Sequence, residues 1–270
     1  MDENQNLKIS KEIRKLTVEC IAHLGVGHIG GCLSIVDLLT VLYYSAMNID
    51  PHNPVKEGRD RLIISKGHAG PAIYSALAHK GYFDKSELKT LNKINTNLPS
   101  HCDMNKTPGI DMTTGSLGQG FSCAVGVAIG SKLKKDGAYI YTIIGDGESQ
   151  EGQIWEAAMY ASHKKLDNLI AFTDHNKMQI DGTTDEINSL GNLVSKWEAF
   201  GWDVHCIDGH DMKKINKTII KAKEIKDRPS MIILNTIKGK GISFVESAGV
   251  GCHNMKINKE QLEMALKELI

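Results

Sequence analysis

The sequence lacks the features that would place it in several large protein classes. Its 32 basic and 32 acidic residues balance, so no excess charge indicates binding to nucleic acid or to an acidic membrane surface. No run approaches the roughly 20 apolar residues that a helix needs to cross a bilayer. The first ten residues, MDENQNLKIS, are polar and lack the apolar core of a signal peptide. We therefore expect neither a nucleic-acid partner nor a membrane protein.

The six cysteines also lack the spacing of a metal or disulfide framework. They are scattered along the chain, and no two of them form a C-x-x-C pair. This distribution argues against a structural zinc site and favours reduced thiols, as in a cytoplasmic protein. The 270 residues are enough for one large or two small domains, and we find neither a repeat nor a low-complexity linker.

The sequence does contain short apolar strands that alternate with helices. Strands are predicted at 60–65, 139–144, 168–173, 203–207 and 230–236. Helices are predicted at 7–24, 34–47 (with Ser34 as its N-cap), 70–80, 85–94, 118–134, 152–164, 190–200 and 211–225. This alternation is typical of βαβ units. It predicts an α/β fold, with a parallel sheet and helices on both of its faces.

Polar residues follow two of these strands at the point where the apolar run ends. A Gly-Asp-Gly turn around Asp146 follows the strand at 139–144, and Asp-His-Asn, ending at Asn176, follows the strand at 168–173. Gly-Asp-Gly alone could be an ordinary turn. However, ligands bind beyond the carboxyl ends of parallel strands, and both motifs lie there. Carboxylate and amide oxygens suit Mg²⁺ or Ca²⁺, and glycines admit a bulky anion, so we predict a metal-bridged diphosphate site.

Two other glycine-rich stretches need an interpretation. GVGHIG at 25–30 matches G-x-G-x-x-G, but it follows a helical pattern and not a strand, so we reject it as a dinucleotide site. GSLGQG at 115–120 opens the helix at 118–134. It either allows a close approach of the backbone to another group or simply starts the helix.

Four stretches resemble transketolase segments in the same order: SKGHAGPAIYSAL, TPGIDMTTGSLGQG, GDGESQEGQIWEA and LDNLIAFTDHNKMQIDG. They contain the thiamine diphosphate signature, in which Gly-Asp-Gly precedes a distant Asn. The resemblance corresponds to only the first of the three domains of transketolase. It therefore implies one thiamine diphosphate-binding domain over residues 1–270, with the pyrimidine-binding and C-terminal domains on a partner chain.

By this resemblance the chain is the N-terminal subunit of a split transketolase. It would transfer a two-carbon ketol group from a ketose phosphate, by default xylulose 5-phosphate, to an aldose phosphate of the pentose phosphate pathway. We expect an α₂β₂ assembly with the C-terminal subunit. We also expect the chain to be inactive alone, because the family's glutamate that activates the aminopyrimidine of the cofactor lies in the pyrimidine domain.

The resemblance also implies how the cofactor is held. Asp146 and Asn176 would ligate Mg²⁺ or Ca²⁺ through their side chains, and Met178 would do so through its main-chain carbonyl, because its sulfur is too soft a ligand. Gly147 would offer its backbone N–H to the diphosphate. Leu117 would lie against the cofactor ring.

Four histidines match family positions and are candidate catalytic residues: His28, His68, His101 and His253. His28 and His101 would lie near the reactive carbon, where they would bind donor hydroxyls and shuttle protons, for which the imidazole pKa near 6.5 is suited. His68 and His253 would also lie near the cofactor, and Gly115 would leave room for its aminopyrimidine.

Some positions depart from the family pattern. Ile29 and Cys102 stand where proline is usual after the preceding histidine, and His253 lies in GVGCHNMK where the family has Trp-His-Gly. The departure at His253 leaves open an altered donor, such as a branched or sulfonated sugar. Glu151 and Glu156 match family acids at the subunit contact, although their spacing fits an exposed helix face equally well.

Two further interpretations remain open. One is a different thiamine diphosphate enzyme, such as a deoxyxylulose phosphate synthase or a ketoacid dehydrogenase component. The Gln150-Glu151-Gly152 stretch and the set of histidines favour transketolase. The other is a non-catalytic subunit that only binds the cofactor, against which the intact Asp146 and Asn176 argue.

Overall fold

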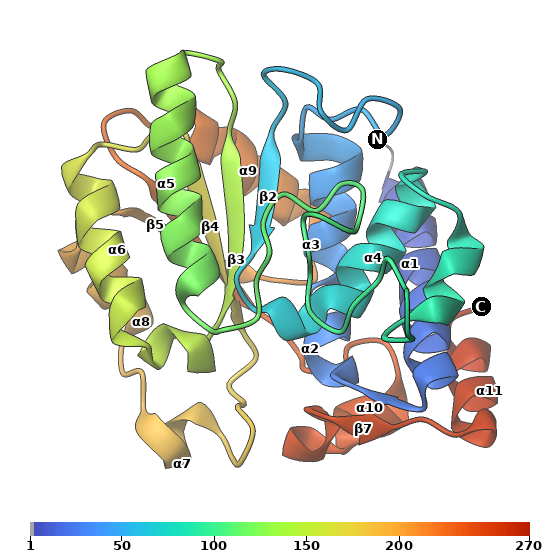
Figure 1. The fold of residues 1–270 in the computed structure, drawn as a ribbon. Coiled ribbons are helices and arrows are strands. Elements are labelled where there is room, and N and C mark those ends of the chain that lie inside the picture. The colour runs from blue at the N-terminus through green and yellow to red at the C-terminus, as the bar shows by residue number, and fades with distance from the viewer. Residues whose placement is uncertain (1–2) are drawn as a thin grey trace.

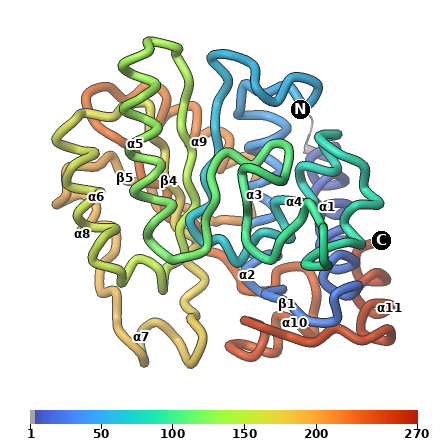
Figure 2. The backbone as a smooth tube through the Cα atoms, in the orientation of Figure 1, coloured from blue at the N-terminus to red at the C-terminus, as the bar shows by residue number. Residues whose placement is uncertain are grey.

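A five-stranded parallel sheet forms the centre of the computed structural model, which describes residues 3–270. The strands are β2 (Arg61–Ile64), β3 (Ile140–Gly145), β4 (Leu169–His175), β5 (Asp203–Asp208) and β6 (Ser230–Asn235). Their order in the sheet is β2-β3-β4-β6-β5, and every neighbouring pair is parallel (Figures 1 and 2). The predicted α/β fold with a parallel sheet is confirmed.

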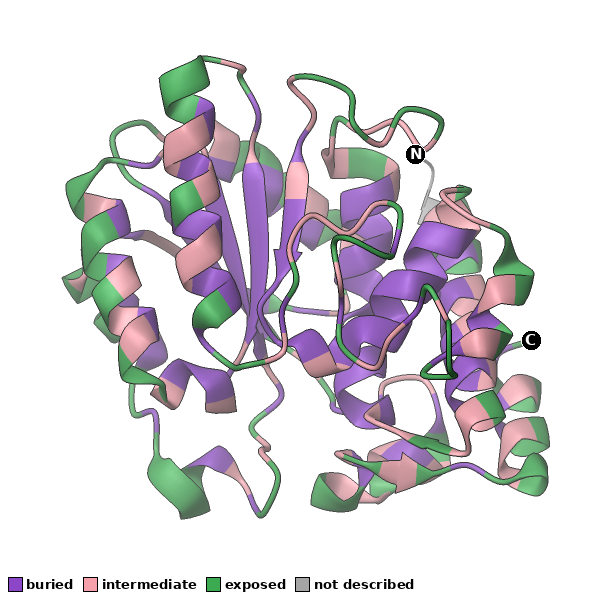
Figure 3. Cartoon of the chain, in the orientation of Figure 1, coloured by how far each residue is buried: buried purple, intermediate pink, exposed green. Residues whose placement is uncertain are grey.

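Helices cover both faces of the sheet (Figure 1). One face carries α5 (Gln119–Lys134), α6 (Gly152–His163) and α8 (Leu193–Ala199). The other face carries α1 (Glu3–Leu24), α3 (Val36–Val41), α4 (Gly70–Lys80) and α9 (Met212–Glu224). Alternate strand residues point to opposite faces of the sheet. Ile144 and Ala171 pack on the side of α5, α6 and α8, whereas Ile143 and Phe172 pack on the side of α1, α3, α4 and α9. Burial on both sides explains why the strands are continuous apolar runs (Figure 3).

The C-terminal part of the chain folds back onto its N-terminal part. β1 (Val26–Gly27) pairs antiparallel with β7 (Met255–Lys256), and this ladder brings the segment around His253 beside the one around His28. The other α-helices within residues 3–270 are α2 (Ile29–Leu33), α7 (Thr184–Asn188), α10 (Ser243–Ser247) and α11 (Lys259–Glu268). In Figure 1, α7 and α10 lie at the same end of the sheet, below the strands.

Two predicted helices differ from the structure. The segment 34–47 is not one helix capped by Ser34, because Ser34 instead ends α2 in a helical conformation and donates its hydroxyl to the Asp174 carboxylate at 2.7 Å. α3 and a π-helical turn at Leu42–Ala46 follow it. The prediction at 85–94 is a 3₁₀ helix that spans only Lys85–Thr90. Asn92, with a φ of 55°, then takes the left-handed conformation that a continuing helix excludes.

The expectation that no segment is apolar enough to span a membrane is wrong for Ile29–Ala46. By length and composition alone this 18-residue segment is apolar enough to cross a membrane. However, 83% of it is buried inside the fold, and it is broken between α2 and α3. Burial against α1, α4 and the sheet accounts for its apolar composition as that of a core segment.

Candidate functional site

The two polar motifs leave the sheet side by side, because β3 and β4 are neighbours. Gly145, the last residue of β3, is the register partner of Asp174 in β4. The backbone N–H of Asp146 donates to the Asp174 carbonyl at 3.2 Å, and the N–H of Lys177 donates to the Asp146 carboxylate at 2.5 Å. The structure therefore brings Asp146 and Asn176 to one edge of the sheet, as the sequence predicted.

A cleft of about 390 Å³ opens at this edge, within the size range of ligand sites. Its lining includes most of the predicted site residues: His28, His68, Gly115, Leu117, Asp146, Gly147, Glu151, Asn176, Met178 and His253. His101 lies just outside the cleft, with its ring 6.5 Å from that of His28. Glu156 is exposed on α6, in a separate hollow between α5 and α6, and so does not face the cleft.

Asp146 supplies a buried carboxylate that a cation would stabilise. It is 2% exposed, and its side chain accepts the N–H of Gly147 at 2.8 Å. Burial, together with the nearby Asp174 carboxylate, raises the pKa of Asp146 to about 7. A cation bound here would favour the ionised form. The Gly147 N–H, predicted to face a phosphate, is taken up by Asp146 in this structure, and its phosphate contact stays a prediction.

Asn176 is oriented by the Asp174 carboxylate. Because a carboxylate only accepts hydrogen bonds, the atom of Asn176 that lies 2.9 Å from it is the amide nitrogen. The amide oxygen then points to the backbone N–H of Met178, at 3.2 Å. The turn is closed by Lys177, whose φ of 64° is left-handed. Asp146, Asn176 and the Met178 carbonyl thus place hard oxygen donors on one cleft, a set that fits Mg²⁺ or Ca²⁺.

Asp174 holds several segments together and was not identified as important from the sequence. It is fully buried and accepts hydrogen bonds from Lys66 at 2.5 Å, from Ser34 at 2.7 Å and from Thr236 at 2.5 Å. Burial alone would raise the pKa of Asp174, but the Lys66 charge and these hydrogen bonds outweigh it and hold the pKa below its usual value. A charged residue at the end of a mostly apolar strand was the sequence signal from which Asp174 could have been found.

Glu148 is a second buried carboxylate that the sequence analysis did not assign. Its two oxygens accept hydrogen bonds from the Ser65 hydroxyl at 2.5 Å, the Gly118 N–H at 2.8 Å and the Gly145 N–H at 2.9 Å. Burial raises the pKa of Glu148, although these hydrogen bonds oppose the effect. The residue therefore joins three of the four stretches that resemble transketolase.

Three of the histidines form a compact cluster beside the oxygen donors. Ring centroids of His28 and His253 are 5.3 Å apart, and His68 lies 5.4 Å from each of them. Burial lowers the pKa of all three, and the neighbouring charge of Lys238 adds to this effect. Neutral imidazoles can both donate hydrogen bonds to hydroxyl groups and accept them, so this cluster suits a polyol substrate.

Lys238 is a site residue that the sequence analysis did not assign. It is 4% exposed, and its ammonium lies 3.4 Å from the Met178 carbonyl and 3.3 Å from His253 Nδ1. Because the ammonium can only donate, Nδ1 of His253 accepts, and its ring proton lies on Nε2. Gly115 also has a packing role, since a Cβ there would lie 3.3 Å from the His101 ring.

Replacing His253 by Gln should make the chain less sensitive to acid. Burial, then Lys238 and His28, lower the pKa of His253 from 6.5 to about 4. Between these values the unfolded chain binds the proton more readily than the folded chain, so stability falls as the pH falls. We compare the melting temperature of the variant with that of the unsubstituted chain at pH 7 and at about pH 4.5. The variant should be more stable, relative to the unsubstituted chain, at the lower pH. The same difference in melting temperature at both pH values would contradict this expectation.

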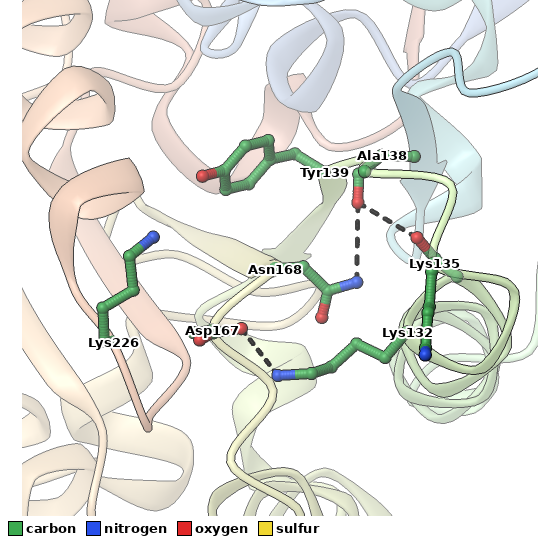
Figure 4. Close-up of a pocket in the computed structure, with 9 residues that line it drawn as sticks. Lys132, Lys135, Ala138, Tyr139, Asp167, Asn168 and Lys226 are labelled. Carbon is green, nitrogen blue, oxygen red and sulfur yellow. Dashed lines mark hydrogen bonds and ion pairs between the residues drawn. The ribbon is translucent and has the colours of Figure 1, made fainter.

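A second hollow lies at the opposite ends of the strands (Figure 4). Tyr139 and Asn168, which immediately precede β3 and β4, line it, together with an ion pair between Lys132 and Asp167 at 2.7 Å. Ligands of parallel sheets bind at the carboxyl ends of strands, and this hollow is at the amino ends. The cleft at Asp146 is therefore the candidate site.

The chain is similar to proteins of one family. A family model described as "Transketolase, thiamine diphosphate binding domain" matches residues 5–269. The 6-deoxy-6-sulfo-D-fructose transketolase subunit SqwG of Clostridium sp. (strain MSTE9) is 60% identical, over 95% of this chain and 93% of that protein. An apulose-4-phosphate transketolase subunit of Phocaeicola vulgatus is 40% identical, over 96% and 92%. The crystal structure of Campylobacter jejuni transketolase superposes with a TM-score of 0.91 and 33% identity, over 100% of this chain but 43% of that one.

Proposed function

Because the chain belongs to the transketolase family through its thiamine diphosphate-binding domain, we propose that it is the N-terminal subunit of a split transketolase. The observation that carries this proposal is the cleft itself. It combines the oxygen donors of Asp146, Asn176 and Met178 with a cluster of neutral histidines. The first group suits a metal and a diphosphate, and the second suits the hydroxyl groups of a sugar.

In this proposal Asp146, Asn176 and the Met178 carbonyl hold Mg²⁺ or Ca²⁺, and through it the diphosphate. When bound, thiamine diphosphate supplies the electron sink that allows the carbon–carbon bond beside the ketose carbonyl to break. His253 would donate from Nε2 to a substrate oxygen, since Lys238 occupies Nδ1. His28 and His68 would orient hydroxyl groups, and His101 would extend this set at the edge of the cleft.

For the donor we propose a sulfonated ketose in place of xylulose 5-phosphate. The support is the 60% identity to the sulfofructose transketolase subunit, compared with 40% to the apulose-4-phosphate subunit. The unusual GVGCHNMK context of His253 is a further reason to expect a non-standard donor. Ketol transfer to an aldose phosphate would then follow the family reaction.

We also propose that a C-terminal subunit completes the site in an α₂β₂ assembly in the cytoplasm. Two apolar residues of the cleft lining, Leu117 and Ile180, are 37% and 66% exposed, and burying them against a partner is favourable. Glu151 and Glu156 are both exposed and accessible to such a partner. The sulfofructose and apulose-4-phosphate relatives, of which this chain covers 93% and 92%, are themselves named as transketolase subunits, which supports a partner subunit.

This chain should show no ketol transfer alone and should become active when the C-terminal subunit is added. The assay contains thiamine diphosphate, Mg²⁺, ribose 5-phosphate or another aldose phosphate, and one of two donors, 6-deoxy-6-sulfofructose or xylulose 5-phosphate. We expect the sulfonated donor to be preferred at least about tenfold in kcat/KM. Activity of the chain alone would disprove the divided-site proposal. Preference for xylulose 5-phosphate would disprove the proposed donor only.

A further inference from the structure

The loop that carries Lys238 into the cleft is held on both sides of that residue. It follows β6 and spans residues 236–241. Before Lys238, the backbone N–H of Ile237 donates to Nε2 of His210 at 2.9 Å. After it, the carbonyl of Lys240 accepts from Nε of Arg14 at 3.1 Å. Two side chains from distant parts of the sequence thus bind the two ends of a short loop.

Both of these side chains converge on one buried carboxylate. Asp37, which is 5% exposed in α3, lies 2.8 Å from Nδ1 of His210 and 2.6 Å from Nη2 of Arg14. Burial would raise the pKa of Asp37, but the charge of Arg14 and the hydrogen bonds from His210 and Arg14 lower it below its usual value. Asp37 therefore stays ionised and accepts from both partners at once.

The contacts of His210 determine its tautomer. Because Nε2 accepts from a backbone N–H, that nitrogen carries no proton. The ring proton is on Nδ1, from which it is donated to Asp37. His210 therefore uses both nitrogens, one as a donor to the carboxylate and one as an acceptor for the loop.

The loop has little freedom to place Lys238 elsewhere. The N–H of Gly239 donates to the Gly30 carbonyl at 3.0 Å. A Cβ on Gly30 would lie 3.0 Å from Cγ of Lys238 and 2.4 Å from Sγ of Cys252, so the lysine stem packs directly on this backbone. A shift of the loop would withdraw the ammonium from the Met178 carbonyl and from His253.

We propose that His210 is a positioning residue, which acts with Asp37 and Arg14 to hold loop 236–241 so that Lys238 faces the diphosphate region of the cleft. None of these three residues is among those that line the cleft. Their effect would therefore be exerted through Lys238. The consequence for cofactor binding rests on the proposed function, whereas the effect on the loop does not.

Two substitutions of His210 separate its two hydrogen bonds. In His210→Asn the side-chain amide can replace Nδ1 and still donate to Asp37, but nothing reaches Ile237. In His210→Gln the longer side chain can place its oxygen at the position of Nε2 and accept from Ile237. His52→Asn, at an exposed residue before β2 and therefore at the other end of the sheet, is the matched control.

The first measurement is hydrogen exchange of the amides in 236–241, on the full chain with and without its C-terminal subunit. The second is the KM for thiamine diphosphate and the kcat of the complex. For His210→Asn we expect exchange to be faster and the cofactor KM to be higher, each by at least about tenfold, with kcat at saturating cofactor changed less than about threefold. His210→Gln and His52→Asn should stay within about threefold of the unsubstituted protein in all three quantities.

Unchanged exchange in His210→Asn would overturn the proposal. So would an equal loss in His210→Asn and His210→Gln, because both variants would then report only a general loss of packing. If the unsubstituted complex bound no thiamine diphosphate, the proposed function would fail. The exchange measurement would still decide whether His210 positions the loop.

Discussion

Asp146→Asn is expected to lower ketol transfer by the assembled enzyme by at least about a thousandfold. Of the three proposed metal donors, Asp146 is the charged one, and the Asn176 amide and the Met178 carbonyl are neutral. The substitution keeps the size of the side chain but removes its charge. The two carboxylate oxygens of Asp146 accept hydrogen bonds from the N–H groups of Gly147 and Lys177, and the substitution replaces one of these oxygens by an NH₂ group that can only donate. Calorimetry should detect no Mg²⁺-dependent binding of thiamine diphosphate to the variant.

The matched control for this substitution is Asp227→Asn. Asp227 is an exposed aspartate between α9 and β6, at the end of the sheet remote from the cleft. It has a φ of 67°, which asparagine also tolerates, so the control should bind the cofactor and act normally. If Asp146→Asn retained more than about a tenth of the activity, Asp146 would not be an essential metal ligand.

Lys66→Met should destabilise the chain by about 3–5 kcal/mol, because it leaves the fully buried Asp174 carboxylate without its cation. The hydrogen bonds from Ser34, Thr236 and Asn176 remain, but none of these groups carries a charge. Denaturant unfolding of this chain measures the effect. If the variant does not fold, that outcome agrees with the same expectation.

A double variant distinguishes the uncompensated charge from lost packing. Lys66→Met combined with Asp174→Asn removes both charges, so it should be more stable than Lys66→Met alone. Lys132→Met is the control, because its ion pair with Asp167 is partly solvent-exposed, with side chains 40% and 25% exposed, and should contribute less than about 1 kcal/mol. A double variant no more stable than the single variant would show that the ion pair is not the cause.

The strands and the two polar motifs could be predicted from the sequence because each depends on neighbouring residues. Continuous apolar runs indicated the strands, and the motifs at Asp146 and Asn176 were visible where those runs end. The helix at 34–47 was predicted wrongly because the conformation of Ser34 depends on a residue far away in the sequence. The hydroxyl of Ser34 binds Asp174, 140 residues away, and no local capping rule contains that partner.

The sequence by itself therefore determined the fold class, the position of the cleft at the strand ends and the relation to transketolase. Only the tertiary structure decided which groups meet there. It pairs Lys66 with Asp174, places His253 beside His28 through the β1–β7 ladder, and joins His210 to the loop of Lys238. These contacts connect residues far apart in the chain. Their geometry depends on how helices and strands pack, and patterns of neighbouring residues do not contain that information.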